Sequence, residues 1–465
     1  MAINRNSPLP LLLCLLGMIG IVCPLKRSEG AEPFRIEVRD RANNWPVPLV
    51  ELKTTHHLSF VTDNAGVVAI DTPEMMGTEV WFHVSGHGYT VPEDGFGYRG
   101  KRITPLPGQS ATIFVDRQLP AKRLGRITGG GQFAHSQKLG HSTAWKEQNL
   151  WGCDSVQITK FQDRLFWIWG DSVLPGYPLG RYNTSGATTD LQPLLSYKPP
   201  IELRYQYFVD EKQVPREIAR MPGKGPTWLM GLTNVKDKKG NEHLVATYSK
   251  IEGLVAEYER GLCRWNPETN QFEQHKVLWQ KSEQKRKPSI APMGHAIEWT
   301  DENGEDWRLF GDPFPTLKCR ATLESWENPE AWIALTPQPQ VSAADQSQSV
   351  QPHRGNIGFN KYRNKWVAIF TQNHGKTSSL GELWYAEANS PIGPWENAIH
   401  VVTHNKYTFY NPKIHETWTN AKGSILTFEA TYTYTFSGND SPTPRHDYNQ
   451  VLYRLDLDEL FQQTR

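Results

Sequence analysis

The chain has 465 residues, and its 50 Lys and Arg nearly balance its 49 Asp and Glu, for a formal charge of +1. This balance excludes a broad basic surface for non-specific nucleic-acid binding, so we expect no nucleic-acid partner. Aromatic residues make up 11% of the chain, which also contains 37 Gly and 33 Pro. Such a composition is typical of a turn-rich globular protein and excludes a disordered or coiled-coil chain.

The N-terminus has the pattern of a secretory signal peptide. Arg5 precedes an apolar stretch from Leu9 to Cys23, and the polar segment Lys26–Ala31 follows. We therefore predict a signal peptide over residues 1–31 and an exported protein, periplasmic or extracellular. An uncleaved anchor is the alternative, but the apolar stretch is short for a membrane span of about 20 residues. We expect no membrane association after cleavage.

Three cysteines follow this segment, Cys153, Cys263 and Cys319. An odd number in an exported chain allows at most one internal disulfide. Because their spacing matches no zinc pattern, we expect them to be buried as small apolar side chains. One oxidised pair is the alternative.

Residues 32–119 read as short alternating strands separated by turns. Phe34–Val38 alternates apolar and polar residues, and the turn Asp63–Gly66 precedes the apolar run Val67–Ile70. About seven strands in roughly 85 residues is the size of a β-sandwich. The order "PVPLVEL" then "TDNAGVVAIDTP" resembles the transthyretin-like, carboxypeptidase-regulatory class of sandwich, which implies an accessory domain. A connector rich in Gly, Ser and His is predicted over residues 120–144.

Residues 145–465 contain an internal repeat. Five aromatic strands that end in a polar residue begin at positions 165, 243, 307, 366 and 424, and turn pairs such as Asn303-Gly304 precede several of them. About 60 residues per four-stranded unit, five times over, predict a β-propeller. The predicted fold is therefore all-β, a five-bladed β-propeller preceded by a small β-sandwich. Two stacked sandwiches are the alternative for the repeat.

Propeller geometry predicts where polar side chains gather. The first strand of each blade lines the central channel and the second strand returns, so first-strand starts and second-strand ends share one face. We expect four catalytic carboxyl groups there, those of Asp154, Asp171, Asp312 and Glu429. We expect substrate-binding side chains on the same face, namely Trp151, Trp169, Tyr177, Lys250, Arg354 and Asn411. Any one of them alone is more often a turn residue, but their convergence indicates a polar functional pocket.

Three histidines occupy comparable positions in successive blades, His295, His353 and His415. Three converging imidazoles can hold a divalent metal ion in the central channel. The alternative is that hydrogen-bonded histidines line the channel. The predicted reaction requires no cofactor, whereas a bound metal would open lyase or metal-assisted chemistry with a His, or Tyr432 or Tyr434, as the base.

Several segments resemble the five-bladed propeller glycosidases, which comprise arabinanases, β-xylosidases and the invertase–levansucrase group. The similarity covers roughly residues 145–460 and is carried by "GCDSVQ", "LFWIWGDS" and "ELWYAEANSPIGPWENAIHVVTH" followed by "FYNP". The resemblance implies that Asp154 is the catalytic base or nucleophile. The acid Glu of a later blade has no clean counterpart, and we assign Glu429 in its place.

Glycosidic cleavage needs one protonated and one ionised carboxyl group, and a neighbouring carboxylate such as Asp171 or Asp312 raises the pKa of the acid. We therefore predict an exported glycoside hydrolase that acts as a monomer on a poly- or oligosaccharide. Arg354 and Lys250 would bind acidic or sulfated sugar groups. The alternative is a non-catalytic propeller that binds a glycan or a surface, with Asp154 and Asp171 held in structural hydrogen bonds.

Overall fold

The computed structural model describes residues 32–129, 134–141, 150–174, 176–194, 196–376, 378–404, 407–435, 437–440, 442 and 447–463. The predicted signal peptide, residues 1–31, lies outside this range. None of the helices within it is both long and apolar enough to cross a membrane. Strands dominate the described chain, which confirms the predicted all-β class.

The N-terminal part is one eight-stranded sheet with strand order β3-β2-β5-β6-β8-β1-β4, and β7 pairs with β5. Its two halves, β3-β2-β5 and β8-β1-β4, enclose one apolar core that includes Ile36, Leu52 and Phe82. This is the predicted sandwich, with the short β6 linking its two layers into one hydrogen-bonded path. The strands are β1 (Phe34–Asp40), β2 (Val50–Thr54), β3 (Ser59–Val61), β4 (Val67–Ile70), β5 (Val80–Gly86), β6 (Tyr89–Thr90), β7 (Gly100–Ile103) and β8 (Ser110–Arg117).

Five four-stranded sheets follow, each built from antiparallel neighbours. The first two contain β11 (Gln157–Phe161), β12 (Arg164–Trp169), β15 (Ser185–Thr189) and β16 (Gln206–Tyr207), then β17 (Thr227–Lys236), β18 (Glu242–Glu252), β19 (Ala256–Asn266) and β20 (Gln271–Gln280). The third and fourth contain β21 (His295–Thr300), β22 (Asp306–Gly311), β23 (Pro315–Arg320) and β24 (Ile333–Ala334), then β27 (Pro352–Asn360), β28 (Lys365–Gln372), β29 (Glu382–Ala388) and β30 (Glu396–Thr403). The fifth contains β31 (Thr408–Ile414), β32 (Ile425–Thr433), β33 (Asn449–Asp456) and β9 (Lys122–Arg126).

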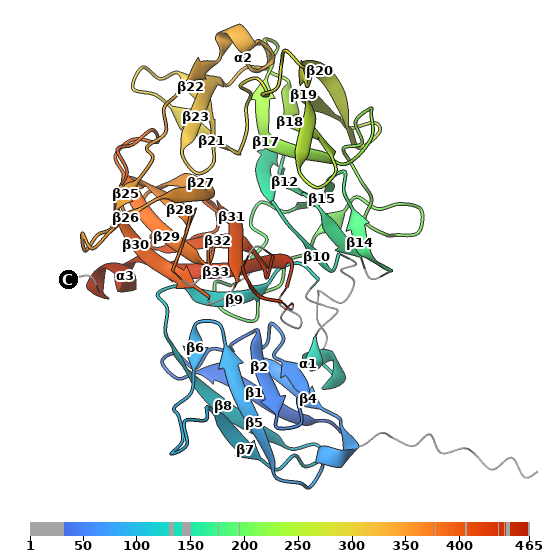
Figure 1. Cartoon of the computed structure of the whole chain (residues 1–465), viewed down its shortest axis with the longest axis vertical. Coiled ribbons are helices and arrows are strands. Elements are labelled where there is room, and N and C mark those ends of the chain that lie inside the picture. The colour runs from blue at the N-terminus through green and yellow to red at the C-terminus, as the bar shows by residue number, and fades with distance from the viewer. Residues whose placement is uncertain are drawn as a thin grey trace, which may run out of the picture.

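The five sheets stand around a common centre (Figure 1). Their first strands contact one another in sequence, β11 with β17, β17 with β21, β21 with β27 and β27 with β31. Aromatic side chains fill the spaces between sheets; Phe166, for example, packs edge-on against Trp265 of the second sheet. The architecture is a five-bladed β-propeller, as predicted from the repeat.

The last blade is completed by a strand from the beginning of the propeller region. β9 pairs antiparallel with β33, so residues of the predicted connector lie beside the last strand of the chain. The Nζ atom of Lys122 also donates to Asp456 at 2.6 Å and to Glu459 at 2.5 Å. Distant parts of the chain are thereby joined in one sheet, which closes the ring.

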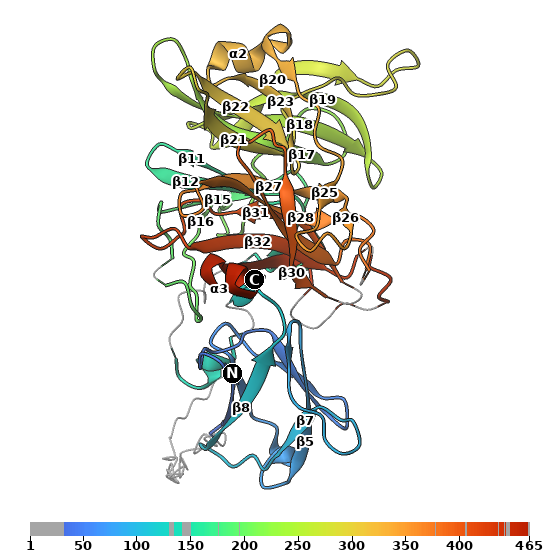
Figure 2. The same cartoon turned by 90° about the vertical axis from the view of Figure 1, so that its left-hand side faces the viewer.

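The N-terminal sheet packs against this fifth blade (Figure 2). The buried guanidinium of Arg123, on β9, donates to the carbonyl oxygens of Pro48 at 2.9 and 2.8 Å and of Leu49 at 3.2 Å. The predicted turn Asp63–Gly66 contributes Asn64, whose side chain exchanges two hydrogen bonds with the backbone of Arg126. The two parts are therefore held by directed contacts between buried groups.

Shorter elements fill the remaining connections. A small sheet contains β10 (Gly152–Cys153), β13 (Ser172–Leu174) and β14 (Tyr177–Arg181), and β25 (Val341–Ser342) pairs with β26 (Ser349–Val350). The helices are α1 (His135–Lys138), α2 (Leu323–Glu327) and α3 (Leu457–Gln463), with single 3-10 turns at Pro73–Met75 and Pro329–Ala331. The three cysteines at 153, 263 and 319 are buried and unpaired, as expected from their spacing.

Candidate functional site

Strand boundaries place three of the four predicted carboxyl groups at one end of the propeller. Asp154 lies in the short connection between β10 and the first blade's inner strand β11, Asp171 follows β12 and Asp312 follows β22. Trp228 lies near the start of β17 and Arg354 near the start of β27, at the same end. We call this group, together with Tyr410 and Asn411 of β31, the mouth. The rule that first-strand starts meet second-strand ends therefore holds for blades one to four.

Asp154 is held from two sides. Tyr410 of the fifth blade donates to its Oδ2 at 2.7 Å, and the backbone N–H of Asp171 donates to its Oδ1 at 3.0 Å. Burial raises the pKa of Asp154, whereas hydrogen bonds from Tyr410 and Tyr448 act in the opposite direction. A side chain on Gly170 would collide with this carboxylate, which explains the glycine before Asp171. Asp154 is thus a fixed acceptor with little spare capacity.

Asp171 has a freer environment. Trp228 Nε1 donates to its Oδ1 at 3.2 Å, and its other carboxyl oxygen accepts no hydrogen bond from the described residues. Burial, and next the negative charge of Asp154, raise the pKa of Asp171 to about 7. A carboxyl group with this pKa is about half protonated at neutral pH and can give up a proton there.

A chain of polar contacts joins Asp312 to the first blade. Arg354 Nη1 lies 3.5 Å from Asp312 Oδ2 and donates to Asn411 Oδ1 at 3.3 Å, and Asn411 Nδ2 donates to Ser155 Oγ at 2.5 Å. Ser155 and Asn411 have φ values of 53° and 48°, a left-handed conformation that strains non-glycine residues and recurs at functional sites. Burial raises the pKa of Asp312 to about 6, and the Arg354 charge opposes this rise.

Glu429 does not reach the mouth, so its predicted position is wrong. β32 continues to Thr433, which places Glu429 in the middle of the strand with a fully buried side chain. Its Oε1 lies 3.0 Å from His415 Nε2, and burial raises its pKa well above the usual value. The strand continues through buried threonines at 431 and 433, whose hydroxyls form hydrogen bonds with other protein groups. Because the sequence-based prediction took the first polar residue as the end of the strand, it placed the end of β32 too early.

The three predicted metal-binding histidines are not brought together. His295 and His353 lie at the starts of β21 and β27, but His415 follows the end of β31 and stacks on Trp418 with ring centroids 3.8 Å apart. Burial, and next the Arg354 charge, lower the pKa of His353 to about 4. No group of three or more His, Cys, Asp or Glu within the described ranges is placed to hold a metal ion. These three histidines therefore do not form the predicted metal site.

Other predicted binding residues have structural roles. Lys250 is buried, and its Nζ donates to Gly225 O at 2.8 Å, Thr227 Oγ1 at 3.2 Å and Met221 O at 3.4 Å, so all three of its protons are engaged. Trp169 is fully buried and stacks on Trp167 at 6.0 Å. Both were expected at an open surface. Trp169 ends β12 and Lys250 lies near the end of β18, and both side chains are buried.

The remaining two aromatic candidates lie beside the first blade. Trp151 is half-buried, and its backbone N–H donates to Val173 O at 2.9 Å. Tyr177 begins β14, but its side chain falls outside what the structure describes. Trp228, by contrast, contacts a mouth carboxyl group directly, through its hydrogen bond to Asp171.

Sequence reasoning missed Tyr410 and Tyr448 as parts of the site. Tyr410 lies within the "FYNP" segment, one residue before the predicted Asn411, so the motif itself carried the signal. Tyr448 donates to the backbone oxygen of Asp171 at 3.3 Å and also bonds the carboxylate of Asp154. No local pattern marks Tyr448, because it reaches the site only through the pairing of β33 with β32.

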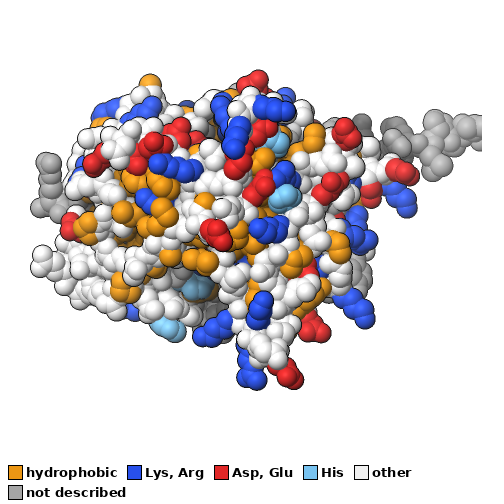
Figure 3. Space-filling model, turned by 90° about the horizontal axis from the view of Figure 1, so that it is seen from above, with side chains coloured by type: hydrophobic (Ala, Val, Ile, Leu, Met, Phe, Trp, Pro, Cys, Tyr) orange, Lys and Arg blue, Asp and Glu red, His pale blue; other side chains and the backbone are white. Residues whose placement is uncertain are grey.

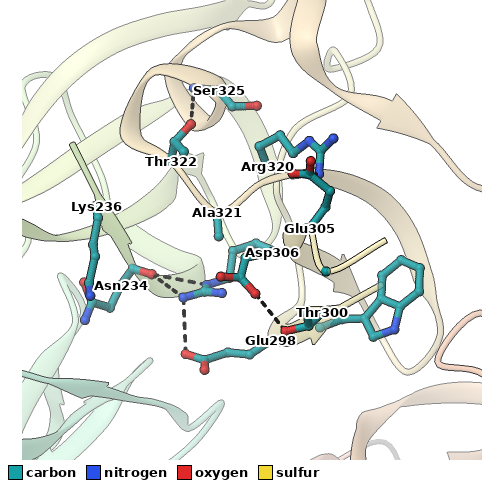
Figure 4. A pocket seen from close by; sticks show the side chains of 13 residues that line it. Asn234, Lys236, Glu298, Thr300, Glu305, Asp306, Arg320, Ala321, Thr322 and Ser325 are labelled. Atoms are coloured by element: carbon teal, nitrogen blue, oxygen red, sulfur yellow. Dashed lines mark hydrogen bonds and ion pairs between the residues drawn. The ribbon is translucent and has the colours of Figure 1, made fainter. Parts of the chain in front are cut away.

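Two hollows lie away from the mouth carboxyls. The larger, about 720 Å³, is between the second and third blades at the far ends of β17 and β21 (Figure 4). Its charges neutralise one another: Arg308 bonds Asn234 O at 2.9 Å and lies 3.4 Å from Glu298. A second hollow of about 520 Å³ lies beside Lys250. The outer face seen in Figure 3 likewise mixes acidic and basic side chains without a large area of one sign.

The chain was compared with known proteins. No protein-family model matches it, and no curated protein is significantly similar in sequence. An exo-β-1,3-galactanase from Phanerochaete chrysosporium matches with TM-score 0.38 and 8% identity, over 65% of this chain and 60% of that one. An exo-1,5-α-L-arabinanase from a bovine ruminal metagenomic library matches with TM-score 0.37 and 11% identity, over 65% and 92%. A GH43 endo-arabinanase from Bacillus licheniformis gives 0.35 and 12%, over 65% and 93%. Likeness at this level transfers no activity to this chain.

Proposed function

We propose that this protein is a carbohydrate-active hydrolase that cleaves glycosidic bonds at the mouth. The observation that carries the proposal is Asp171, a carboxyl group whose pKa is raised to about 7 by burial and by the charge of the neighbouring Asp154. Asp312, with a pKa of about 6, is largely ionised at pH 7. One protonated and one ionised carboxyl group are what glycosidic hydrolysis requires.

The roles follow from hydrogen-bonding capacity. The Asp171 carboxyl group gives its proton to the departing glycosidic oxygen, because one of its oxygens has no other partner among the described residues. Asp312 takes a proton from the water that attacks the anomeric carbon. Asp154 is saturated by donors and raises the pKa of Asp171 through its charge. From the sequence, Asp154 was expected as the base or nucleophile and Glu429 as the acid. In this assignment Asp171 is the acid and Asp312 the base, Asp154 only raises the pKa of the acid, and Glu429 takes no part in the reaction.

A non-catalytic glycan-binding propeller is the second candidate, and one observation favours it. Both oxygens of Asp154 accept hydrogen bonds, and Asp312 accepts the backbone N–H of Gly355 at 2.6 Å while lying near Arg354. Carboxylates held in this way bind hydroxyl groups without needing to exchange protons.

We further propose the cellular setting and the division of the chain. The signal peptide over residues 1–31 would direct export to the periplasm or the medium, where the protein would act as a monomer. Residues 32–119 would form the accessory domain and residues 145–465 the propeller, with the connector 120–144 donating β9 to the last blade.

A panel of polysaccharides tests both candidates. Purified mature protein is incubated with each, and reducing ends and bound protein are measured. Hydrolysis predicts new reducing ends that fall at least a hundredfold in Asp171→Asn and Asp312→Asn. Exposed Asp163→Asn is the matched control and should retain full activity. Glu429→Gln should also retain it, since that side chain is buried away from the mouth. Binding without any new reducing ends would support the second candidate instead.

A further inference from the structure

Arg354 contacts Asp312 and Asn411 at the mouth, and part of its guanidinium is free for a ligand. Both of its contacts, to Asn411 and Asp312, use Nη1. Nε and Nη2 have no hydrogen-bond partner among the described residues, and the side chain is 40% exposed. The edge formed by Nε and Nη2 is the geometry that binds a carboxylate or sulfate through two parallel hydrogen bonds.

Two imidazoles lie near enough to Arg354 for its charge to act on them. Burial lowers the pKa of both His295 and His353. The charges of Lys413 and, next, Arg354 lower the pKa of His295 further, and the charge of Arg354 lowers that of His353. Both rings are therefore neutral at pH 7, and a neutral imidazole still offers one N–H donor. The buried Nδ1 of His353 has no partner within the described chain. His353 Nδ1 can therefore serve a ligand as a donor or an acceptor, according to the tautomer of the ring.

The nearby carboxyl groups leave room for an anion. Asp312 is the acidic group closest to Arg354, at 3.5 Å, and it contacts the Nη1 side of the guanidinium. Asp154 is separated from Arg354 by Asn411 and Ser155 and is covered by its own donors. The opposite edge of the guanidinium is therefore open to a ligand group of negative charge.

From this geometry we infer that the mouth takes an acidic sugar, and that Arg354 binds the carboxylate of a uronate or the sulfate ester of a sulfated residue through its Nε–Nη2 edge. The inference rests on the proposed carbohydrate site and names its substrate class. Uronates and sulfated sugars both present an oxyanion on a sugar ring, planar in the carboxylate and tetrahedral in the sulfate ester.

A glycan array that carries neutral, uronate-containing and sulfated oligosaccharides tests the inference. We expect the full mature protein to bind uronate-containing glycans, sulfated glycans or both, and to bind methyl-esterified uronates at least tenfold more weakly. Arg354→Gln should weaken binding about ten- to a hundredfold, and Arg354→Lys should recover only part of it, because the charge returns without the fork. Arg102→Gln, with a side chain 71% exposed on the N-terminal sheet, is the matched control and should bind as the wild type does.

The outcomes separate this inference from the proposed function. Binding confined to neutral glycans, absence of acidic-glycan binding, or unchanged affinity in a folded Arg354→Gln variant would overturn the acidic-sugar inference. Cleavage of neutral glycans would at the same time uphold hydrolysis. Acidic glycans that bind through Arg354 but are never cleaved would uphold the inference and reject hydrolysis. Circular dichroism of each variant establishes that it is folded.

Discussion

The phenol of Tyr410 donates a hydrogen bond of 2.7 Å to Asp154, across 256 positions of the sequence. Tyr410 lies on the inner strand of the fifth blade, and Asp154 lies in the short segment that leads into the inner strand of the first. One contact therefore joins the two ends of the ring and fixes a carboxylate of the mouth. The hydrogen bond that joins the first and fifth blades therefore also positions the Asp154 carboxylate.

The variant Tyr410→Phe removes this hydrogen bond without changing the shape of the ring. The free energy of unfolding should fall by about 1.5–3 kcal/mol, the range for a hydrogen bond to a charged group. The pKa of Asp154 should also rise further, because Tyr410 opposes the effect of burial. Urea unfolding at pH 7 measures the first effect, with Tyr98→Phe, whose side chain is 57% exposed, as the control. Coinciding curves for Tyr410→Phe and the wild type would contradict the expectation.

Asp171 should make stability depend on pH. Its pKa rises from 3.8 to about 7 on folding, so the folded chain binds more protons than the unfolded chain between these values. The free energy of unfolding should therefore decrease as pH rises through this window. Asp171→Asn abolishes the ionisation and keeps an acceptor for Trp228. At pH 8 the variant should be more stable than the wild type by about 1–4 kcal/mol, and near pH 4 the two should agree.

Urea titrations at pH 4, 6 and 8 check this prediction. Asp163→Asn, in an exposed turn, controls for the loss of a carboxylate that is already hydrated. Parallel pH profiles for the wild type and Asp171→Asn would show that Asp171 keeps an ordinary pKa.

Hydrolysis should show a bell-shaped pH profile. The rate requires Asp312 to be ionised and Asp171 to be protonated, so the limbs should lie near pH 6 and pH 7. Because the Arg354 charge holds down the pKa of Asp312, Arg354→Gln should move the acidic limb to higher pH. Measuring kcat/KM between pH 4 and 9 reports both limbs. An acidic limb that stays in place in this variant would exclude Asp312 as the base.

The attachment of the N-terminal sheet depends on Arg123. Its guanidinium bonds the carbonyl oxygens of Pro48, Leu49 and His87 and lies 5.3 Å from the centre of the Tyr89 ring. Arg123→Ala leaves these buried acceptors unpaired and should lower the free energy of unfolding by about 2–4 kcal/mol.

Arg41→Ala provides the comparison for Arg123→Ala. Arg41 pairs with Asp116 at 2.8 Å, but its side chain is 54% exposed, so the loss should stay below about 1 kcal/mol. Thermal and urea unfolding of both variants measures the two losses of unfolding free energy. Equal losses would mean that the buried bonds of Arg123 contribute no more than a surface ion pair.

The sequence by itself was sufficient for the repeat, the all-β class and the position of three aspartates at strand ends. Alternation and turn residues are local properties, and a propeller places every equivalent strand end at the same face. The sequence could therefore predict that Asp154, Asp171 and Asp312 lie at the same end of the propeller.

Only the tertiary structure decided which polar side chains remain accessible. Thr431 and Thr433 extend β32 past Glu429, and Lys250 turns inward to carbonyl oxygens of the loop before β17. Pairing of β9 with β33 and the contact of Tyr410 with Asp154 likewise join residues far apart in sequence. A buried strand accepts polar residues when distant groups satisfy their hydrogen bonds, and no local pattern reveals those partners.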